Sequence, residues 1–167
     1  MSLATDTLAT SVFLRGLNVL SGLIDRAMES GLDEAAVMEA RLAPDMRPFP
    51  DQIRMAAFAA RSCVARLTDQ PWPRTDDAEA SLADLKATVA LSIAFIEGVE
   101  AAAFEGGETR RVELRFPGIE LNFAGAGYLT SFALPNFYFH LSMAYAVLRH
   151  LGVPLGKRDY LGQLELI

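Results

Sequence analysis

Four segments of the chain carry apolar residues at the three- and four-residue spacing that places one buried stripe on a helix. The segments run from about residue 3 to 28, from 50 or 51 to 70, from 82 to 99, and from 134 to 148. Gly31, Pro71, Gly106 and Gly152 follow them as stop signals. The stripes predict a four-helix bundle, and they consist of Phe13, Leu17, Leu20, Ile24 and Ala27; Ile53, Ala57, Ala60, Val64 and Leu67; Leu82, Leu85, Val89, Ile93, Ile96 and Val99; and Leu134, Phe137, Leu141, Tyr145 and Leu148.

Between the third and fourth segments the apolar period changes from helical to two. Apolar and polar residues alternate over 112–116 and again over 119–123, with Pro117-Gly118 between the two runs. This pattern predicts a β-hairpin, whose apolar face we expect to pack on the bundle because two strands alone are marginally stable. The predicted fold class is therefore mainly all-α: a four-helix bundle with a small hairpin between helices three and four. We expect one domain over residues 1–167, with a short helical piece at 33–41 and an irregular tail or short turn after residue 154.

Composition excludes several classes of protein. The 167 residues are 51% hydrophobic with a net charge of −6, which excludes a disordered chain. Basic residues are scattered singly or in pairs, so nucleic acid is not an expected partner. The single cysteine and an acidic residue ahead of the first basic one predict a cytoplasmic protein without a secretory signal. The uncharged stretch 121–148 contains Gly, Pro, Asn and His, and we interpret its helical part as a buried core helix, not a membrane span.

Asn136 and His140 are the most informative polar residues of the sequence. They lie four residues apart on the apolar fourth helix, and hence on one face. They are either a remnant metal-ligand pair or a buried polar pair whose hydrogen bonds are satisfied within the protein. His150 is too far along the helix to bind the same ion. Cys63 has no histidine nearby in sequence, and we interpret it as a small buried residue.

Three further residues flank the proline-rich connection before the second helix. Arg41, Asp45 and Gln52 are candidates for the mouth of a pocket, although Asp45 could equally organise the turn. No phosphate-binding glycine loop and no Gly-x-Ser-x-Gly elbow occurs in the sequence.

Four stretches resemble a bacterial family of domains of unknown function. They are Arg41–Met46, Leu134–His140, Leu148–Pro154 and Gly156–Gly162, which together extend the resemblance over essentially the whole chain. That family lies within the DinB-like superfamily, which also contains YfiT-like metal-dependent proteins. The resemblance implies a four-helix bundle with a small β element, often as a homodimer.

The resemblance also implies where a metal would bind. Metal-binding relatives use a His-x-x-x-His pair on the last helix and a third ligand from helix two. The second histidine of the pair corresponds to His140, and the first position is occupied by Asn136. Because helix two has no histidine, we expect a degenerate metal site and no bound cofactor.

Two function classes follow from these observations. The first is a non-catalytic protein that binds a small molecule or acts as a dimeric interaction module. The second is a hydrolase or thiol transferase that depends on a divalent metal such as Zn or Ni, with an altered ligand set around His140 and Asn136. Metal content discriminates between the two classes.

Overall fold

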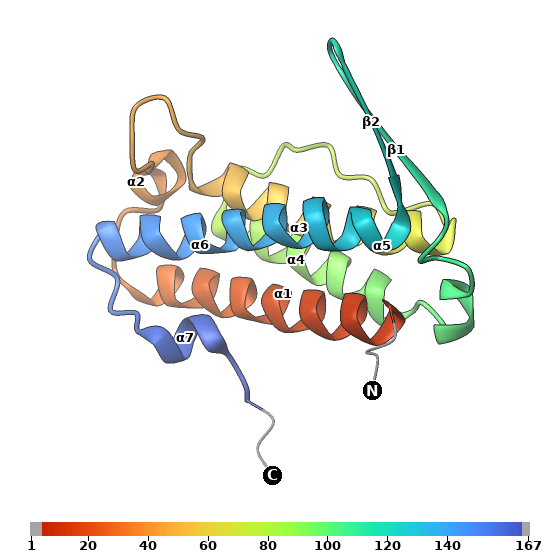
Figure 1. The fold of residues 1–167 in the computed structure, drawn as a ribbon. Coiled ribbons are helices and arrows are strands. Elements are labelled where there is room, and N and C mark those ends of the chain that lie inside the picture. Colours follow the sequence, from red (N-terminus) through yellow and green to blue (C-terminus); the bar gives the residue numbers. More distant parts are fainter. Residues whose placement is uncertain (1–4, 165–167) are drawn as a thin grey trace.

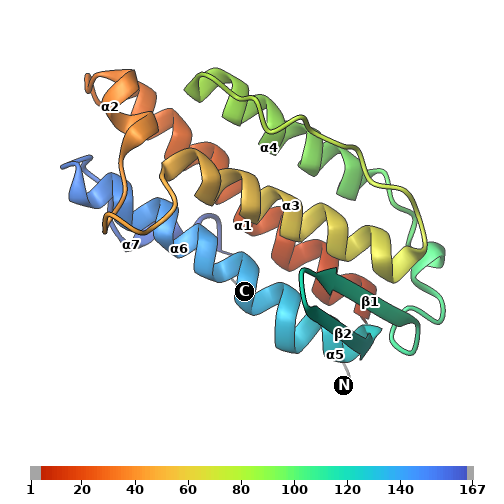
Figure 2. The same cartoon turned by 90° about the horizontal axis from the view of Figure 1, so that it is seen from above.

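The computed structural model describes residues 5–164, and its four long helices confirm the predicted bundle. They are α1 (Thr5–Glu29), α3 (Phe49–Thr68), α4 (Leu82–Glu97) and α6 (Leu134–His150). Figure 1 shows them side by side with roughly parallel axes, and Figure 2 shows α4 and α6 on opposite sides of the bundle. The shorter elements are α2 (Glu34–Glu39), η1 (Ala101–Phe104), β1 (Arg111–Phe116), β2 (Ile119–Ala124), α5 (Gly125–Tyr128), η2 (Leu129–Ala133) and α7 (Lys157–Leu161).

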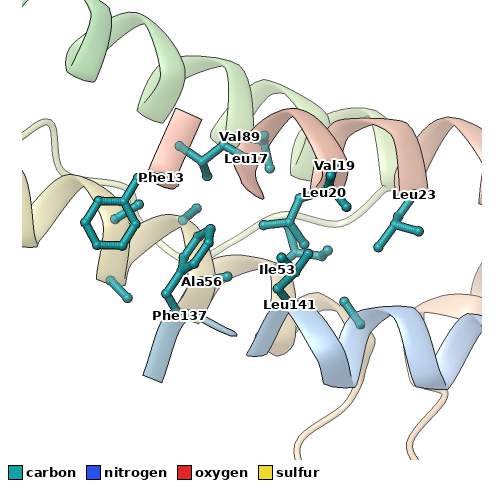
Figure 3. Close-up of a cluster of buried hydrophobic side chains, with 14 of the residues drawn as sticks. Phe13, Leu17, Val19, Leu20, Leu23, Ile53, Ala56, Val89, Phe137 and Leu141 are labelled. Atoms are coloured by element: carbon teal, nitrogen blue, oxygen red, sulfur yellow. The ribbon is translucent and has the colours of Figure 1, made fainter. Parts of the chain in front are cut away.

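The predicted stripes form the core. Every stripe residue of α1 and α3 is at most 2% exposed. Phe13 and Phe137 meet edge to face with their ring centroids 5.1 Å apart, and both belong to the cluster that Figure 3 draws. Burial of apolar side chains on all four helices supplies the main driving force for the bundle. Ser81 caps the start of α4, since its Oγ accepts a hydrogen bond from the Asp84 amide at 3.1 Å.

One helix has the length and composition of a membrane span. The stretch Thr7–Glu29 of α1 is the only one among the described residues that passes this test. Its stripe residues are buried against the other helices of the bundle, which is how a core helix of a soluble protein meets the same test. The helical part of the uncharged stretch 121–148 is a core helix, as predicted, because Phe137, Leu141 and Leu148 of α6 are buried.

The last long helix begins earlier than the sequence predicts. Residues 125–133, which lie between the predicted hairpin and the predicted fourth helix, are helical: α5, the π-helical turn η2 and α6 follow one another without a break. Pro135 gives the physical reason for the π turn. It has no N–H to donate to the carbonyl of residue 131, and its ring crowds that carbonyl, so the preceding turn widens.

The hairpin forms where alternation predicts it, but its apolar face does not pack on the bundle along its full length. β1 and β2 pair antiparallel from Arg111 opposite Ala124 to Phe116 opposite Ile119. Val112 is buried, whereas Phe116 and Ile119 at the tip are 48% and 56% exposed. Figure 1 shows the hairpin rising away from the helices. Gly118 in the turn has a φ of +77°, a conformation that favours glycine.

The segments outside the bundle are short and ordered. The predicted helical piece at 33–41 is α2, whose first turn is capped by the Asp33 carboxylate. The tail, predicted to be irregular or a short turn, contains the five-residue helix α7. The connection between α3 and α4 has no regular structure. It runs along the same side of the bundle from which the hairpin rises, and together they enclose the space described below (Figure 1).

Candidate functional site

His140 is a buried core residue with a defined partner on α3. Its Nδ1 lies 2.8 Å from Oε1 of Gln52, and Gln52 Nε2 donates to the Arg47 carbonyl oxygen at 3.0 Å. This amide orientation makes His140 Nδ1 the donor to Gln52 Oε1. Burial, with a smaller contribution from the positive charge of Arg47, lowers the pKa of His140, so the imidazole is neutral at pH 7.

The other sequence candidates do not gather around His140. Asn136 is half-buried and lines a large cavity instead, and no hydrogen bond joins its side chain to His140 within the described chain. Arg41 is exposed, and its Nε donates to the Glu39 carbonyl oxygen at 3.3 Å. Asp45 is exposed in the same connection. The structure thus brings Gln52 and His140 together and leaves Asn136, Arg41 and Asp45 apart from that pair.

This arrangement does not fit a metal site of the kind that the resemblance implies. Within residues 5–164 no three His, Cys, Asp or Glu side chains converge in a way that could hold a metal ion. His140 Nδ1 is engaged by Gln52, and a neutral amide at Asn136 is a poor ligand for zinc or nickel. We therefore derive no chemistry through a metal.

Metal analysis tests this interpretation of His140. Protein purified without chelator or affinity tag should contain far less than one equivalent of transition metal, and EDTA should leave the melting temperature unchanged. His140→Ala should lower the free energy of unfolding by about 1–3 kcal/mol in urea titrations, through a lost hydrogen bond and a small cavity. The exposed His150 provides the matched control, and His150→Ala should change the free energy of unfolding little. Stoichiometric metal that both EDTA and His140→Ala remove would contradict the interpretation.

A large concave feature lies on the side of α3 that faces the hairpin. It is a cavity of about 850 Å³ between α3, the α3–α4 connection, β1 and the helix that begins at Gly125. One wall is apolar and aromatic: Phe58, Trp72, Phe116, Tyr128 and Phe132. Phe58 and Trp72 meet edge to face at 6.2 Å, while Tyr128 and Phe132 stack at 5.9 Å. A cavity of this size and composition is typical of a small-molecule site.

Arginine side chains form much of the rest of the lining. They come from α3 and its entrance (Arg47, Arg54, Arg61 and Arg66), from the connection (Arg74) and from β1 (Arg115). In the sequence these arginines occur singly. The sequence analysis therefore described the basic residues as scattered and did not identify a basic site. One detectable sign was the spacing of Arg54, Phe58 and Arg61, which places them on one face of α3. No comparable sequence pattern indicates that Arg74 of the connection and Arg115 of β1 line the same cavity.

Two titratable groups beside the cavity keep their protons. Burial raises the pKa of Tyr128 to about 12, so the phenol stays protonated. Burial also raises the pKa of the Cys63 thiol, which is fully buried in α3. Cys63 is therefore an unreactive core residue and not a nucleophile.

Comparison with known proteins agrees with the geometry of the bundle. Residues 7–161 match the sequence profile of the family described as Domain of unknown function (DUF1993). A crystal structure of a DinB family member protein from Shewanella denitrificans is similar to this chain, with a TM-score of 0.85 and 33% identity over 95% of this chain and 92% of the other. No match is found among curated proteins. The chain belongs to the DUF1993 family of domains of unknown function, within the DinB-like superfamily.

Proposed function

We propose that the protein is a non-catalytic small-molecule-binding protein whose ligand occupies the cavity beside α3. The observation that carries this proposal is the cavity itself, which combines a volume of about 850 Å³, an aromatic wall and a few polar groups. Lining side chains come from four separate parts of the chain, so a bound molecule would contact the bundle, the connection and the hairpin together. The homodimer implied by the family resemblance stays a prediction, and the proposal does not depend on it.

The lining offers little support for catalysis. The described residues around the cavity include neither histidine nor cysteine. Two of its three carboxylates are engaged by arginines: Asp51 pairs with Arg54 at 2.6 Å and Arg47 at 3.2 Å, and Glu113 pairs with Arg115. The third, Asp77, accepts a hydrogen bond from Thr75 Oγ1 at 3.1 Å. The metal-dependent enzyme therefore stays the alternative, with metal content as its test.

A ligand panel with two matched phenylalanine variants tests the proposal. Drug-sized compounds of neutral, cationic and anionic character would be screened by thermal shift, and emission of Trp72 would be recorded. Trp72 is the single tryptophan of the chain and lines the cavity, so ligands that bind there should alter its emission. Phe58 lines the cavity and its side chain is 43% exposed. Phe58→Ala removes this part of the cavity wall and should weaken ligand binding at least several-fold.

Phe139→Ala is the control for this experiment. Phe139 is 54% exposed on α6 and does not line the cavity, so its removal should leave ligand affinity unchanged. If no compound shifts both the melting temperature and the Trp72 emission, or if Phe139→Ala weakens binding as much as Phe58→Ala, the cavity is not the ligand site.

A further inference from the structure

Building on the proposed function, we infer that the ligand is an organic anion whose charged group binds Arg61, Arg66 and Arg74 and whose ring or apolar body packs on the aromatic wall. The cavity lining contains six arginines and three carboxylates, Asp51, Asp77 and Glu113. It therefore carries a net charge of about +3 within a chain whose net charge is −6. A positive cavity in an acidic protein selects against cations and concentrates anions.

Half of the cavity arginines are neutralised by the protein. Arg47 pairs with Asp51, Arg54 pairs with Asp51 and Glu79, and Arg115 pairs with Glu113. Among the described residues, no carboxylate lies within ion-pair distance of the three that remain. These three cations come from two turns of α3 and from the α3–α4 connection, and they carry the excess positive charge of the cavity.

Arg61 is the deepest of the three. Arg61 is 2% exposed. Its guanidinium donates hydrogen bonds only to neutral hydroxyl groups, to Ser92 Oγ at 3.0 Å and to Thr75 Oγ1 at 2.9 Å. Its Nε is buried without a hydrogen-bond partner. Burial lowers the pKa of Arg61, and the negative charges of Asp77 and Glu79 offset this only in part. A buried guanidinium without an ion-pair partner is costly, and an anion in the cavity would supply the missing charge.

Arg66 is held in place by aromatic rings. Its guanidinium carbon lies 4.8 Å from the centroid of Trp72 and 5.9 Å from that of Tyr128. Its Nη1 donates to the Ser62 carbonyl oxygen at 3.2 Å. This leaves most of its five N–H groups available to a ligand in a planar fork that matches carboxylate or phosphate oxygens.

Arg74 is exposed at the rim, with no ion pair or hydrogen bond of its side chain among the described residues. Its position favours a role in attracting the ligand and closing over its charged end. Phe58 and Phe132 line the same cavity, and their rings offer an apolar group a surface to pack on. The combination defines the ligand class as a carboxylate, phosphonate or phosphate ester attached to an aromatic or apolar body.

Three small compounds of similar shape and different charge test the inference. The probes are phenylphosphonate, benzyl alcohol and benzylammonium, titrated against Trp72 emission of the full chain. Phenylphosphonate should bind most tightly, and its affinity should fall as salt concentration rises because charge–charge attraction is screened. Arg66→Gln should lower that affinity about tenfold or more, since it removes a charged hydrogen-bond partner. Arg74→Gln should lower it to a smaller extent.

Arg158→Gln is the matched control. Arg158 is an exposed arginine on α7, on the side of the bundle away from the hairpin (Figure 1), and its loss should change affinity by less than about twofold. If benzyl alcohol binds as tightly as phenylphosphonate, and Arg66→Gln has no effect, the anion inference is overturned while the cavity stays a ligand site. If none of the probes binds at any salt concentration, the anion inference fails. If, in addition, the wider panel finds no ligand, the proposed function fails with it.

Discussion

Gly125→Ala should destabilise the protein by about 3 kcal/mol or more, the upper end of what overpacking costs. Gly125 is buried at the start of α5, where the chain leaves the hairpin and enters the last long helix. A Cβ built on it would lie 1.9 Å from the Gly107 carbonyl oxygen and 2.9 Å from Leu67 Cδ2. The nearest obstacle is backbone, so no side-chain rotation relieves it. Either the 107 loop or the helix start must move, and the hairpin wall of the cavity moves with it.

Gly127→Ala is the control for this prediction. Gly127 lies half a turn further along the same short helix and is exposed, and a Cβ added to it would have no atom within 4 Å. Alanine there should be neutral or should stabilise the protein by up to about 1 kcal/mol, because it restricts the unfolded chain and favours the helix. Urea denaturation of both variants measures the difference. Similar free energies of unfolding for the two would show that the close approach of Gly107 and Gly125 is not important.

Phe137→Ala should lower the free energy of unfolding by about 3–5 kcal/mol, the cost of emptying a fully buried aromatic site. Its ring is 0% exposed and contacts Phe13 edge to face at 5.1 Å (Figure 3). The same ring lies directly on Gly16 of α1, since a Cβ at Gly16 would be 2.4 Å from it. Glycine there allows α1 and α6 to approach, so the neighbouring helices cannot readily fill the space that alanine leaves.

The exposed Phe139, two residues further along α6, provides the comparison for Phe137. Phe139→Ala should change stability by no more than about 0.5–1 kcal/mol, because more than half of its surface stays exposed to water. Thermal and urea unfolding of the two variants would report the difference. A loss of under about 1 kcal/mol for Phe137→Ala would contradict the interpretation of the core.

Helical periodicity predicted the bundle because burial of one stripe per helix is a local property of the sequence. Phe13, Leu17 and Ile53 are buried as their spacing requires. Helical periodicity did not predict the early start of the last helix. Gly125 and Gly127 are typical turn residues by propensity, and Gly125 is needed for its contact with Gly107, a residue that is distant in sequence.

The hairpin illustrates a different limit of sequence reasoning. Alternation predicted its two strands, but not that Phe116 and Ile119 would stay exposed, since alternation does not indicate how far a strand extends beyond the surface below it. The cavity was missed for a related reason. Arg66, Arg74 and Arg115 belong to three separate elements, and only tertiary structure places them around one space.

His140 was identified from sequence, while its partner was not. Gln52 was a candidate for the mouth of a pocket, but the sequence did not pair it with His140. The hydrogen bond between them depends on the relative rotation of α3 and α6, which periodicity does not define to the level of one side chain.

A crystal structure of the protein with phenylphosphonate tests the central claim most directly. We expect the phosphonate oxygens to lie within hydrogen-bond distance of the Arg61 and Arg66 guanidinium groups, with the phenyl ring against Phe58 and Phe132. Phenylphosphonate bound only outside the cavity, or a cavity closed by its own side chains in the crystal, would contradict the claim that this space is the ligand site of the protein.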